Sequence, residues 1–166
     1  WMSSRADIVC RYPHVVQALK DVGCFMFSVG FESGSQRMLD LMNKGTTVEQ
    51  NLEAARIIGE LGLVLYCNIM TGSPTETRSE MVQTYEMVHK MQEMCGHDKV
   101  NVSVAFFSPY PGSTWAEKAI AEGDSLLTES NYDRYPQQPR LKSQLGNYDF
   151  MCMLRDGKFE EAKRQI

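Results

Sequence analysis

The sequence predicts an α/β domain built from parallel βα units. Three observations support this fold class: short apolar runs alternate with longer amphipathic segments, the runs are rich in β-branched and aromatic residues, and the amphipathic segments have recognisable helix caps. Strands that alternate with helices favour right-handed βαβ units on one parallel sheet. On these grounds an open doubly wound sheet and part of a barrel are both allowed.

Four strands are expected. Three apolar runs of strand length cover residues 25–31, 64–70 and 100–107. Residues 1–4 are expected to be the stump of an earlier strand. Because the chain begins with Trp rather than Met, we expect it to be a piece of a longer polypeptide whose N-terminal remainder is its partner.

The first expected helix follows residues 1–4. Pro13 suits the first turn of a helix, since its missing N–H is not needed there, and Gly23 is placed to end it. Along this helix the spacing predicts that Val15, Val16 and Leu19 point inward.

The later helices carry clearer caps. Ser35 can cap a short helix, and Thr47 and Thr77 each begin a capping box, with Gln or Glu three residues later. Gly62 and Gly96 are placed to end the two helices that these boxes begin. The sequence therefore predicts a helix in each interval between the strands.

The pattern weakens towards the C-terminus. A short helix is expected at residues 114–122, an irregular surface segment at 131–144, where Pro, Gln, Arg and Tyr are frequent, and a helical stub at 158–166. We therefore expect a βα region over residues 1–126 and an irregular or helical C-terminal extension over residues 127–166.

Composition narrows the possible classes of function, and a local basic patch that binds nucleic acid stays open. No apolar run approaches the length of a membrane-spanning helix, and the net charge of −4 argues against general nucleic-acid binding. No basic and apolar leader is visible, so we expect a cytoplasmic protein. The five cysteines form no CxxC pair, and the three histidines lack a second ligand at metal-binding spacing, so neither a disulfide framework nor a metal site is expected.

Candidate binding residues follow the strands, because parallel α/β sheets bind ligands at the carboxyl edge. Glu32 and Ser33 offer a carboxylate and a hydroxyl to a ligand, although simple capping of the next helix explains them equally well. Asn68 can hydrogen-bond a ligand, and Gly72 permits a close approach. An isolated Asn in an apolar strand is, however, more often a satisfied structural group.

Two further positions are candidates on the same reasoning. The turn that begins at Ser108 and Pro109 is rigid, and its aromatic residues can either cover a flat base such as adenine or pack on the next helix. Arg5, after the first strand, can bind a carboxylate or a phosphate, or lie as a surface cation. No catalytic residue is assigned.

Three strand ends, taken in order, resemble a known family. Their motifs are GFESGS at 30–35 followed by KGTT at 44–47, TGSPTET at 71–77, and PYPGS at 109–113. They are similar to the second half of a radical S-adenosylmethionine (SAM) enzyme, in particular of the group that often carries an N-terminal cobalamin-binding domain. The resemblance covers about residues 1–127 and leaves the tail unrecognised.

The resemblance implies the later part of a partial TIM barrel, also called an α/β horseshoe. It implies SAM as a ligand and a [4Fe-4S] cluster held by a CxxxCxxC loop. This chain has no such motif, so the cluster ligands, and cobalamin where it is used, would lie outside it. The full-length protein would be a radical SAM enzyme that forms a 5′-deoxyadenosyl radical for substrate modification such as methyl transfer, and the chain alone would be inactive.

The resemblance also implies roles for the strand-end residues. Glu32 and Ser33 would contact the amino acid or ribose part of SAM, and Asn68 would help to hold the ribose. The turn from Ser108 to Gly112 would lie near the adenine.

Arg5 and Lys44 are candidates for binding the anionic groups of SAM or of the substrate. The identity of the substrate does not follow from the sequence.

Two alternatives remain beside the radical SAM interpretation. One is a non-catalytic α/β binding or scaffold module without a cluster, and the other is an unrelated α/β barrel or Rossmann-like enzyme.

Overall fold

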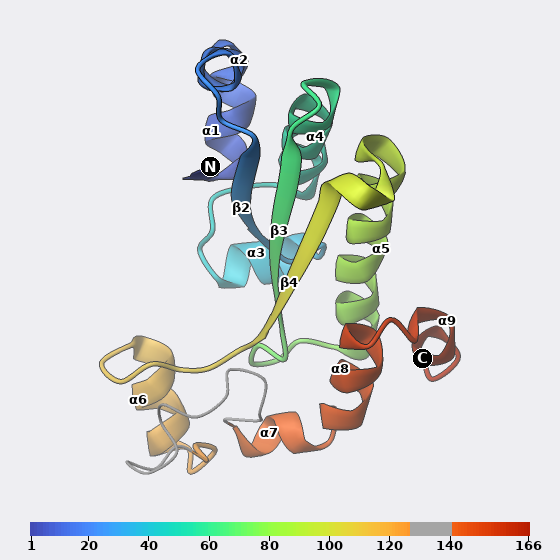
Figure 1. Cartoon of the computed structure of the whole chain (residues 1–166). Helices are drawn as coiled ribbons and strands as arrows, with labels where there is room; N and C mark the ends of the chain where they lie inside the picture. Colours follow the sequence, from blue (N-terminus) through green and yellow to red (C-terminus); the bar gives the residue numbers. More distant parts are fainter. Residues whose placement is uncertain (127–140) are drawn as a thin grey trace.

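The computed structural model of the chain describes residues 1–126 and 141–166. These residues contain a four-stranded parallel sheet in the order β1-β2-β3-β4 (Figure 1). The strands are β1 (Met2–Ser4), β2 (Met26–Glu32), β3 (Val64–Thr71) and β4 (Val100–Phe106). The expected strands and the parallel α/β fold are therefore confirmed. The strand order follows the chain without the reversal of a doubly wound sheet, which favours part of a barrel.

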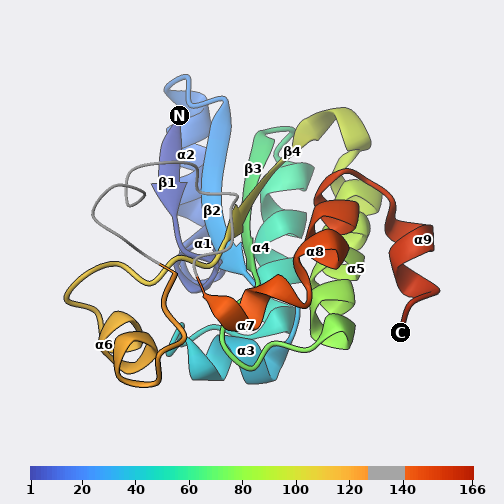
Figure 2. The same cartoon turned by 90° about the horizontal axis from the view of Figure 1, so that it is seen from below.

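Helices connect the strands and continue beyond the last one. They are α1 (Ala6–Arg11), α2 (Pro13–Asp21), α3 (Gln36–Leu41), α4 (Val48–Glu60), α5 (Arg78–Cys95), α6 (Thr114–Ala121), α7 (Lys142–Leu145), α8 (Tyr148–Arg155) and α9 (Phe159–Lys163), with a 3₁₀ turn at His97–Lys99. Helix α8 lies beside α5, whereas α6 lies apart from both (Figures 1 and 2). Among the described residues, none of the helices has the length and apolar character that a bilayer crossing needs.

Both predicted capping boxes form. Thr47 Oγ1 accepts a hydrogen bond from the Gln50 N–H, while Gln50 Oε1 accepts one from the Thr47 N–H. Thr77 and Glu80 make the same exchange at the start of α5. Gly96 takes a φ of 94° where α5 ends. These helix boundaries follow from local backbone chemistry, so the sequence predicted them correctly.

The two central strands bury every second side chain against the helices. These residues are Phe27, Val29 and Phe31 of β2 and Leu65, Cys67 and Ile69 of β3. Burial of each large apolar side chain contributes about 1.5–3 kcal/mol. The alternate residues stay partly exposed on the opposite side of the sheet, which we call the open face (Ser28, Gly30, Tyr66, Asn68 and Ser103).

Some expected details differ from the structure. Helix α1 was not expected, and of the three side chains expected to point inward on α2, Val16 is buried, but Val15 is 45% exposed. Residues 131–140 of the expected irregular segment lie outside the described residues. Residues 142–144, expected to be irregular, belong to α7 (Lys142–Leu145).

The C-terminal helices share the core of the sheet. Phe150, Met151 and Leu154 of α8 and Ala162 of α9 belong to the apolar cluster that also contains the buried strand residues. The Tyr148 ring meets the Phe106 ring edge to face at a centroid distance of 6.0 Å. Residues 148–162 therefore help to cover the helix side of the sheet rather than trailing away from it.

Candidate functional site

The end of β2 turns Glu32 back over the open face. The pairing with β3 shifts between Gly30 and Glu32, which marks a bulge at Phe31, and Glu32 has a φ of 62°. A Cβ atom at Gly30 would lie 2.6 Å from Glu32 Oε1 and 3.0 Å from Lys44 Nζ. The carboxylate and the ammonium therefore occupy the space that a side chain at position 30 would fill.

Lys44 and Arg5 complete a charged cluster at this end of the sheet. Lys44 Nζ donates to Glu32 Oε1 at 2.8 Å, and the two side chains are 18% and 26% exposed. Arg5 Nη2 donates to the Lys44 carbonyl oxygen at 2.7 Å, and Arg5 Nε donates to Asp7 at 3.0 Å. The structure thus brings together three residues that the sequence singled out. Two of them, Glu32 and Lys44, form a partly exposed ion pair that is worth about 1 kcal/mol or less.

Asn68 lies beside this cluster, because it pairs with Gly30 in the sheet. Its Nδ2 donates to Ser28 Oγ at 2.9 Å and to the Val29 carbonyl oxygen at 3.2 Å. Its Oδ1 accepts no hydrogen bond from the described residues. Asn68 is therefore oriented by the sheet, and its amide oxygen is left as an acceptor on the open face.

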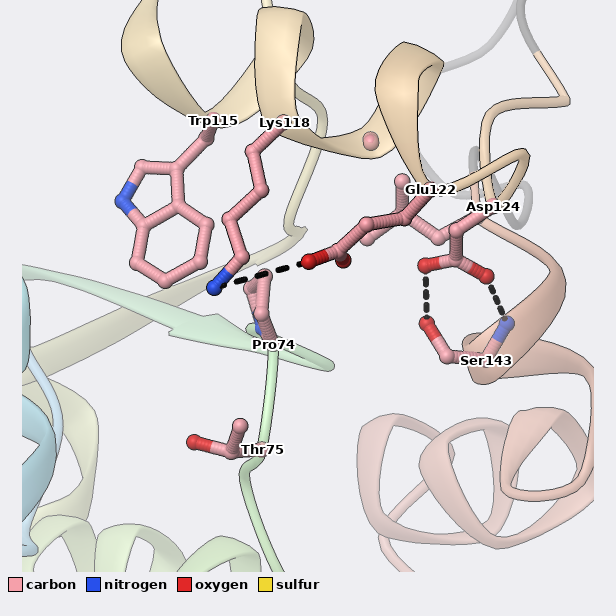
Figure 3. A pocket seen from close by; sticks show the side chains of 9 residues that line it. Pro74, Thr75, Trp115, Lys118, Glu122, Asp124 and Ser143 are labelled. Atoms are coloured by element: carbon pink, nitrogen blue, oxygen red, sulfur yellow. Dashed lines mark hydrogen bonds and ion pairs between the residues drawn. The ribbon is translucent and has the colours of Figure 1, made fainter.

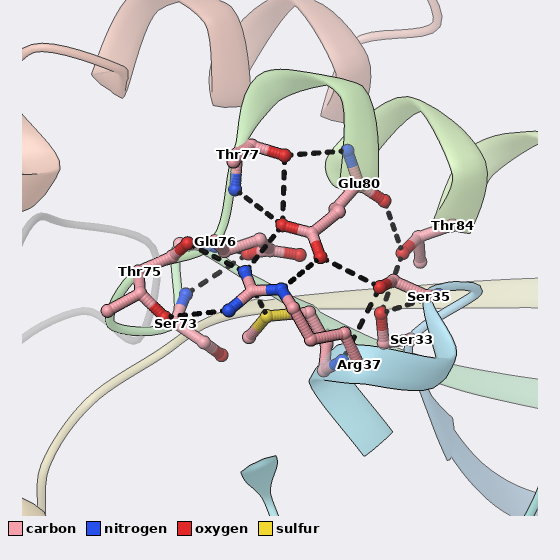
Figure 4. A network of polar contacts seen from close by, with 11 residues as sticks. Ser33, Ser35, Arg37, Ser73, Thr75, Glu76, Thr77, Glu80 and Thr84 are labelled. Atoms are coloured by element: carbon pink, nitrogen blue, oxygen red, sulfur yellow. Dashed lines mark hydrogen bonds and ion pairs between the residues drawn. The ribbon is translucent and has the colours of Figure 1, made fainter. Parts of the chain in front are cut away.

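Ser33 is turned away from the open face. It is fully buried, and its Oγ lies 3.1 Å from Thr84 Oγ1 and accepts a hydrogen bond from the Ser35 N–H at 3.1 Å (Figure 4). Ser35 Oγ in turn accepts from the Met38 N–H and caps α3. The Ser33 hydroxyl therefore links the end of β2 to α5. Ser33 thus has a structural role, which the sequence had left open beside ligand binding.

Gly72 lies under the C-terminal helices. It has a φ of 78°, and a Cβ atom there would lie 2.4 Å from Met151 Cε and 3.3 Å from Gln144 Nε2. The close approach that this glycine permits is therefore made by α7 and α8 of the same chain.

Ser108 and Pro109 follow β4, Ser108 half-buried and Pro109 buried. The preceding Phe107 donates its N–H to the Thr71 carbonyl oxygen at 2.8 Å. Its ring meets Trp115 of α6 edge to face at 6.3 Å. Phe107 thus packs on the next helix, one of the two roles that the sequence left open for this turn.

A polar network that the sequence did not predict ties α3 to the loop before α5 (Figure 4). Arg37 Nε and Nη2 each donate to Glu80 at 2.7 Å, and Nη2 also donates to the Thr75 carbonyl oxygen at 2.8 Å. Ser35 Oγ and the Thr77 N–H also donate to this carboxylate, both at 2.9 Å. The hydrogen bonds from Arg37, above all, lower the pKa of Glu80 to about 2.

Arg37→Met is expected to lower the free energy of unfolding at pH 7, because it removes the bidentate partner of Glu80. The lowered pKa of Glu80 stabilises the fold above pH 4.5, and this stabilisation is lost as the pH falls towards 2. The free energy of unfolding of Arg37→Met should therefore also depend less on pH between 4.5 and 2 than that of the wild type. Urea unfolding at pH 7, 4 and 3 measures both effects.

Arg56→Met is the matched control, since Arg56 pairs with Glu53 and Glu60 on the exposed side of α4. We expect Arg56→Met to lower the free energy of unfolding less than Arg37→Met does. Equal losses in the two variants would show that the Arg37 network adds nothing beyond a surface ion pair.

Glu76 is a buried carboxyl group in the same loop. Its Oε2 accepts the N–H groups of Gly72 and Ser73 at 2.6 and 3.1 Å, while its Oε1 has no partner among the described residues. Burial raises the pKa of Glu76 to about 7. The group borders a cavity of about 200 Å³ that Gln144 and Met151 also line.

A second cavity, of about 170 Å³, lies between Pro74 and Trp115 of α6 (Figure 3). Lys118 Nζ lies 5.3 Å from the Trp115 ring centroid and 3.9 Å from Glu122 Oε1. Asp124 accepts hydrogen bonds from the Ser143 hydroxyl and N–H at the far wall. None of the lining residues belongs to the open face or to the Glu32–Lys44 cluster, so this cavity is separate from the candidate site.

The cysteines do not fit an iron–sulfur cluster. In the part of the chain that the structure describes, no three His, Cys, Asp or Glu side chains gather as a metal site. Cys67 is buried in the sheet, and burial raises the pKa of its thiol to about 12. Since cluster ligation needs thiolates from several neighbouring cysteines, these residues cannot supply it.

Comparison with protein families gives an independent result. The family model described as the radical SAM superfamily matches residues 4–88, just over half of the chain. The matched region begins at the last residue of β1 and includes β2, β3, most of α5 and the cluster of Arg5, Glu32 and Lys44.

Curated relatives match a larger part of the chain. An uncharacterized methyltransferase of Pyrococcus horikoshii is 33% identical over 121 residues, which are 73% of this chain and 25% of the relative. An anaerobic magnesium-protoporphyrin IX monomethyl ester cyclase of Rubrivivax gelatinosus is 28% identical over 68% of this chain and 19% of the relative. A tRNA-2-methylthio-N(6)-dimethylallyladenosine synthase of Aquifex aeolicus is 29% identical over 69% of this chain and 26% of the relative. The chain thus spans about a quarter or less of the length of these relatives.

Proposed function

Because the chain belongs to the radical SAM superfamily, we propose that it forms one wall of the SAM-binding site of a radical SAM enzyme. The observation that carries the proposal is the Glu32–Lys44 pair, folded over Gly30 and next to Asn68 at the carboxyl end of the sheet. Ligands bind at this edge in parallel α/β folds.

The chemistry of the cluster suits SAM. The methionine part of SAM carries an ammonium group and a carboxylate. The Glu32 carboxylate can bind the ammonium group, and the Lys44 ammonium group can bind the carboxylate. The Glu32–Lys44 ion pair is partly exposed. Contacts with the zwitterionic part of SAM can therefore replace it at a small cost in free energy. The Asn68 amide oxygen can accept from a ribose hydroxyl, and Arg5 holds the backbone of Lys44 in place.

Radical chemistry needs parts that this chain does not contain. A [4Fe-4S] cluster, when bound, would supply the one electron that cleaves SAM into methionine and the 5′-deoxyadenosyl radical used for substrate modification. We propose that the cluster ligands, and cobalamin where it is used, are contributed from outside this chain, whose own cysteines do not fit a cluster. Methyl transfer is our candidate reaction for the whole protein, on the ground that the P. horikoshii relative is named a methyltransferase.

We expect the purified chain to bind SAM, and Glu32→Gln and Lys44→Met each to weaken that binding about tenfold. Each variant removes one charge-assisted hydrogen bond to the ligand, and about 1.4 kcal/mol corresponds to a factor of ten. Isothermal titration calorimetry of the chain with SAM measures the effect.

Arg56→Met serves as the control, since Arg56 lies on the exposed side of α4, and its SAM affinity should equal that of the wild type. Binding of adenosine as strong as binding of SAM, or variants that bind SAM as well as the wild type, would contradict the proposal and favour an α/β binding module of another kind.

A further inference from the structure

The C-terminal segment contacts the loops that follow β3 and β4. Gln144 of α7 is 3% exposed, and its Nε2 donates to the carbonyl oxygens of Gly72 and Phe107, both at 2.8 Å. Gly72 directly follows β3, and Phe107 directly follows β4. One side-chain amide therefore uses both of its protons to bridge two consecutive βα loops.

The amide is itself held in place. Gln144 Oε1 accepts the Leu141 N–H at 3.0 Å, which fixes the side chain against the start of its own helix. Arg78 donates to Asn147 Oδ1 at 2.9 Å and to the Gly146 carbonyl oxygen at 3.2 Å, so the end of α7 is attached to the start of α5. The bridge is therefore a built contact rather than a chance approach of a surface side chain.

The sheet alone does not join the two loops beyond their first residues. The last backbone hydrogen bond between them runs from the Phe107 N–H to the Thr71 carbonyl oxygen. Past this bond, Gln144 supplies the link to the carbonyl oxygens of Gly72 and Phe107. Without its two protons, the buried Gly72 carbonyl group and the partly buried Phe107 carbonyl group would both lose a hydrogen bond, and we expect the loops to open more readily to water.

We propose that Gln144 is a positioning residue for SAM binding, which holds the loops after β3 and β4 at the separation that the bound ligand needs. This inference rests on the proposed function, because the two loops border the carboxyl edge where SAM is proposed to bind. It assigns a role to a segment that lies outside the family match at residues 4–88. Gln144 acts through the loops and is not expected to touch SAM.

The test combines two measurements on the whole chain, hydrogen exchange of the loop amides and titration with SAM. Gln144→Met keeps the volume of the side chain but removes both donors. We expect amides in residues 72–76 and 107–112 to exchange at least tenfold faster, with exchange in β2 and α4 unchanged, and SAM to bind about tenfold more weakly. Gln17→Met, which removes an exposed hydrogen bond to Asp21 on α2, should change neither measurement.

A second variant covers the case in which Gln144→Met fails to fold. Gln144→Asn retains the amide on a shorter side chain that can reach one carbonyl group but not both, so one of the two loops should exchange faster and SAM binding should weaken to a smaller extent. Unchanged exchange in both loops would overturn the bridge. Faster loop exchange with unchanged SAM affinity would overturn the positioning role, and a wild-type chain that binds no SAM would overturn the proposed function while the exchange measurement still judges the bridge.

Discussion

Gly34→Ala is expected to destabilise the protein by about 3 kcal/mol. A Cβ atom at this position would lie 2.4 Å from the Gln83 carbonyl oxygen and 2.8 Å from Thr84 Cα, both in the backbone of α5. The loop cannot easily move away, since the Gly34 N–H donates to Thr84 Oγ1 at 3.0 Å and Ser33 contacts the same hydroxyl. Urea unfolding monitored by circular dichroism measures the loss.

Gly146→Ala is the control for this substitution. A Cβ atom at Gly146 would meet no atom of the described residues within 4 Å, and the φ of −67° suits any residue. We expect a change within about 0.5 kcal/mol. A loss for Gly34→Ala as small as that of the control would mean that α5 shifts to admit the methyl group.

Glu76→Gln is expected to stabilise the protein at pH 8 by about 2–3 kcal/mol relative to the wild type, and to have little effect near pH 5. The folded state raises the pKa of Glu76 to about 7 from an ordinary value near 4.5, so it favours the protonated form. The stability that this preference contributes is complete below pH 4.5 and is lost as the pH rises to 7. A glutamine keeps an oxygen for the N–H groups of Gly72 and Ser73 but does not titrate.

Unfolding free energies at pH 5, 6, 7 and 8 for the wild type and for Glu76→Gln test this expectation. Glu93→Gln, at an exposed position of α5, is the matched control. Its unfolding free energy should depend on pH in the same way as that of the wild type. If the unfolding free energy of Glu76→Gln has the same pH dependence as that of the wild type, the Glu76 carboxyl group does not bind its proton more tightly in the folded state.

Elements with local determinants could be predicted from the sequence. The strands, and the helices that begin at Thr47 and Thr77, depend on apolar periodicity and on caps within four residues. Helix α1 was missed because Arg5 makes no side-chain cap, and because the helix is held by distant contacts with α4, such as the Cys10 Sγ bond to the Gln50 carbonyl oxygen. Helix α8 follows a stretch of sequence without clear hydrophobic periodicity, so its buried side was not predicted.

The candidate site was predicted in part. Arg5, Glu32 and Lys44 were singled out, and they do lie together. The direction of Ser33 could not be predicted, since it follows a bulge and a positive φ at the preceding residue, and both break the simple alternation of a strand. The bridging role of Gln144 carried no local signal, because the two carbonyl groups that it bridges lie 72 and 37 residues away in the chain.

The order of the strands in the sheet has a consequence for how the chain folds. Each strand pairs with the strand before it in the sequence, so a growing chain can add one βα unit at a time to a sheet that already exists. The contact between Gln144 and Gly72 closes a much longer stretch of chain and needs β3 and β4 to be in place first. The parallel sheet can therefore form before the contact between Gln144 and Gly72, which we expect to be among the last contacts to form.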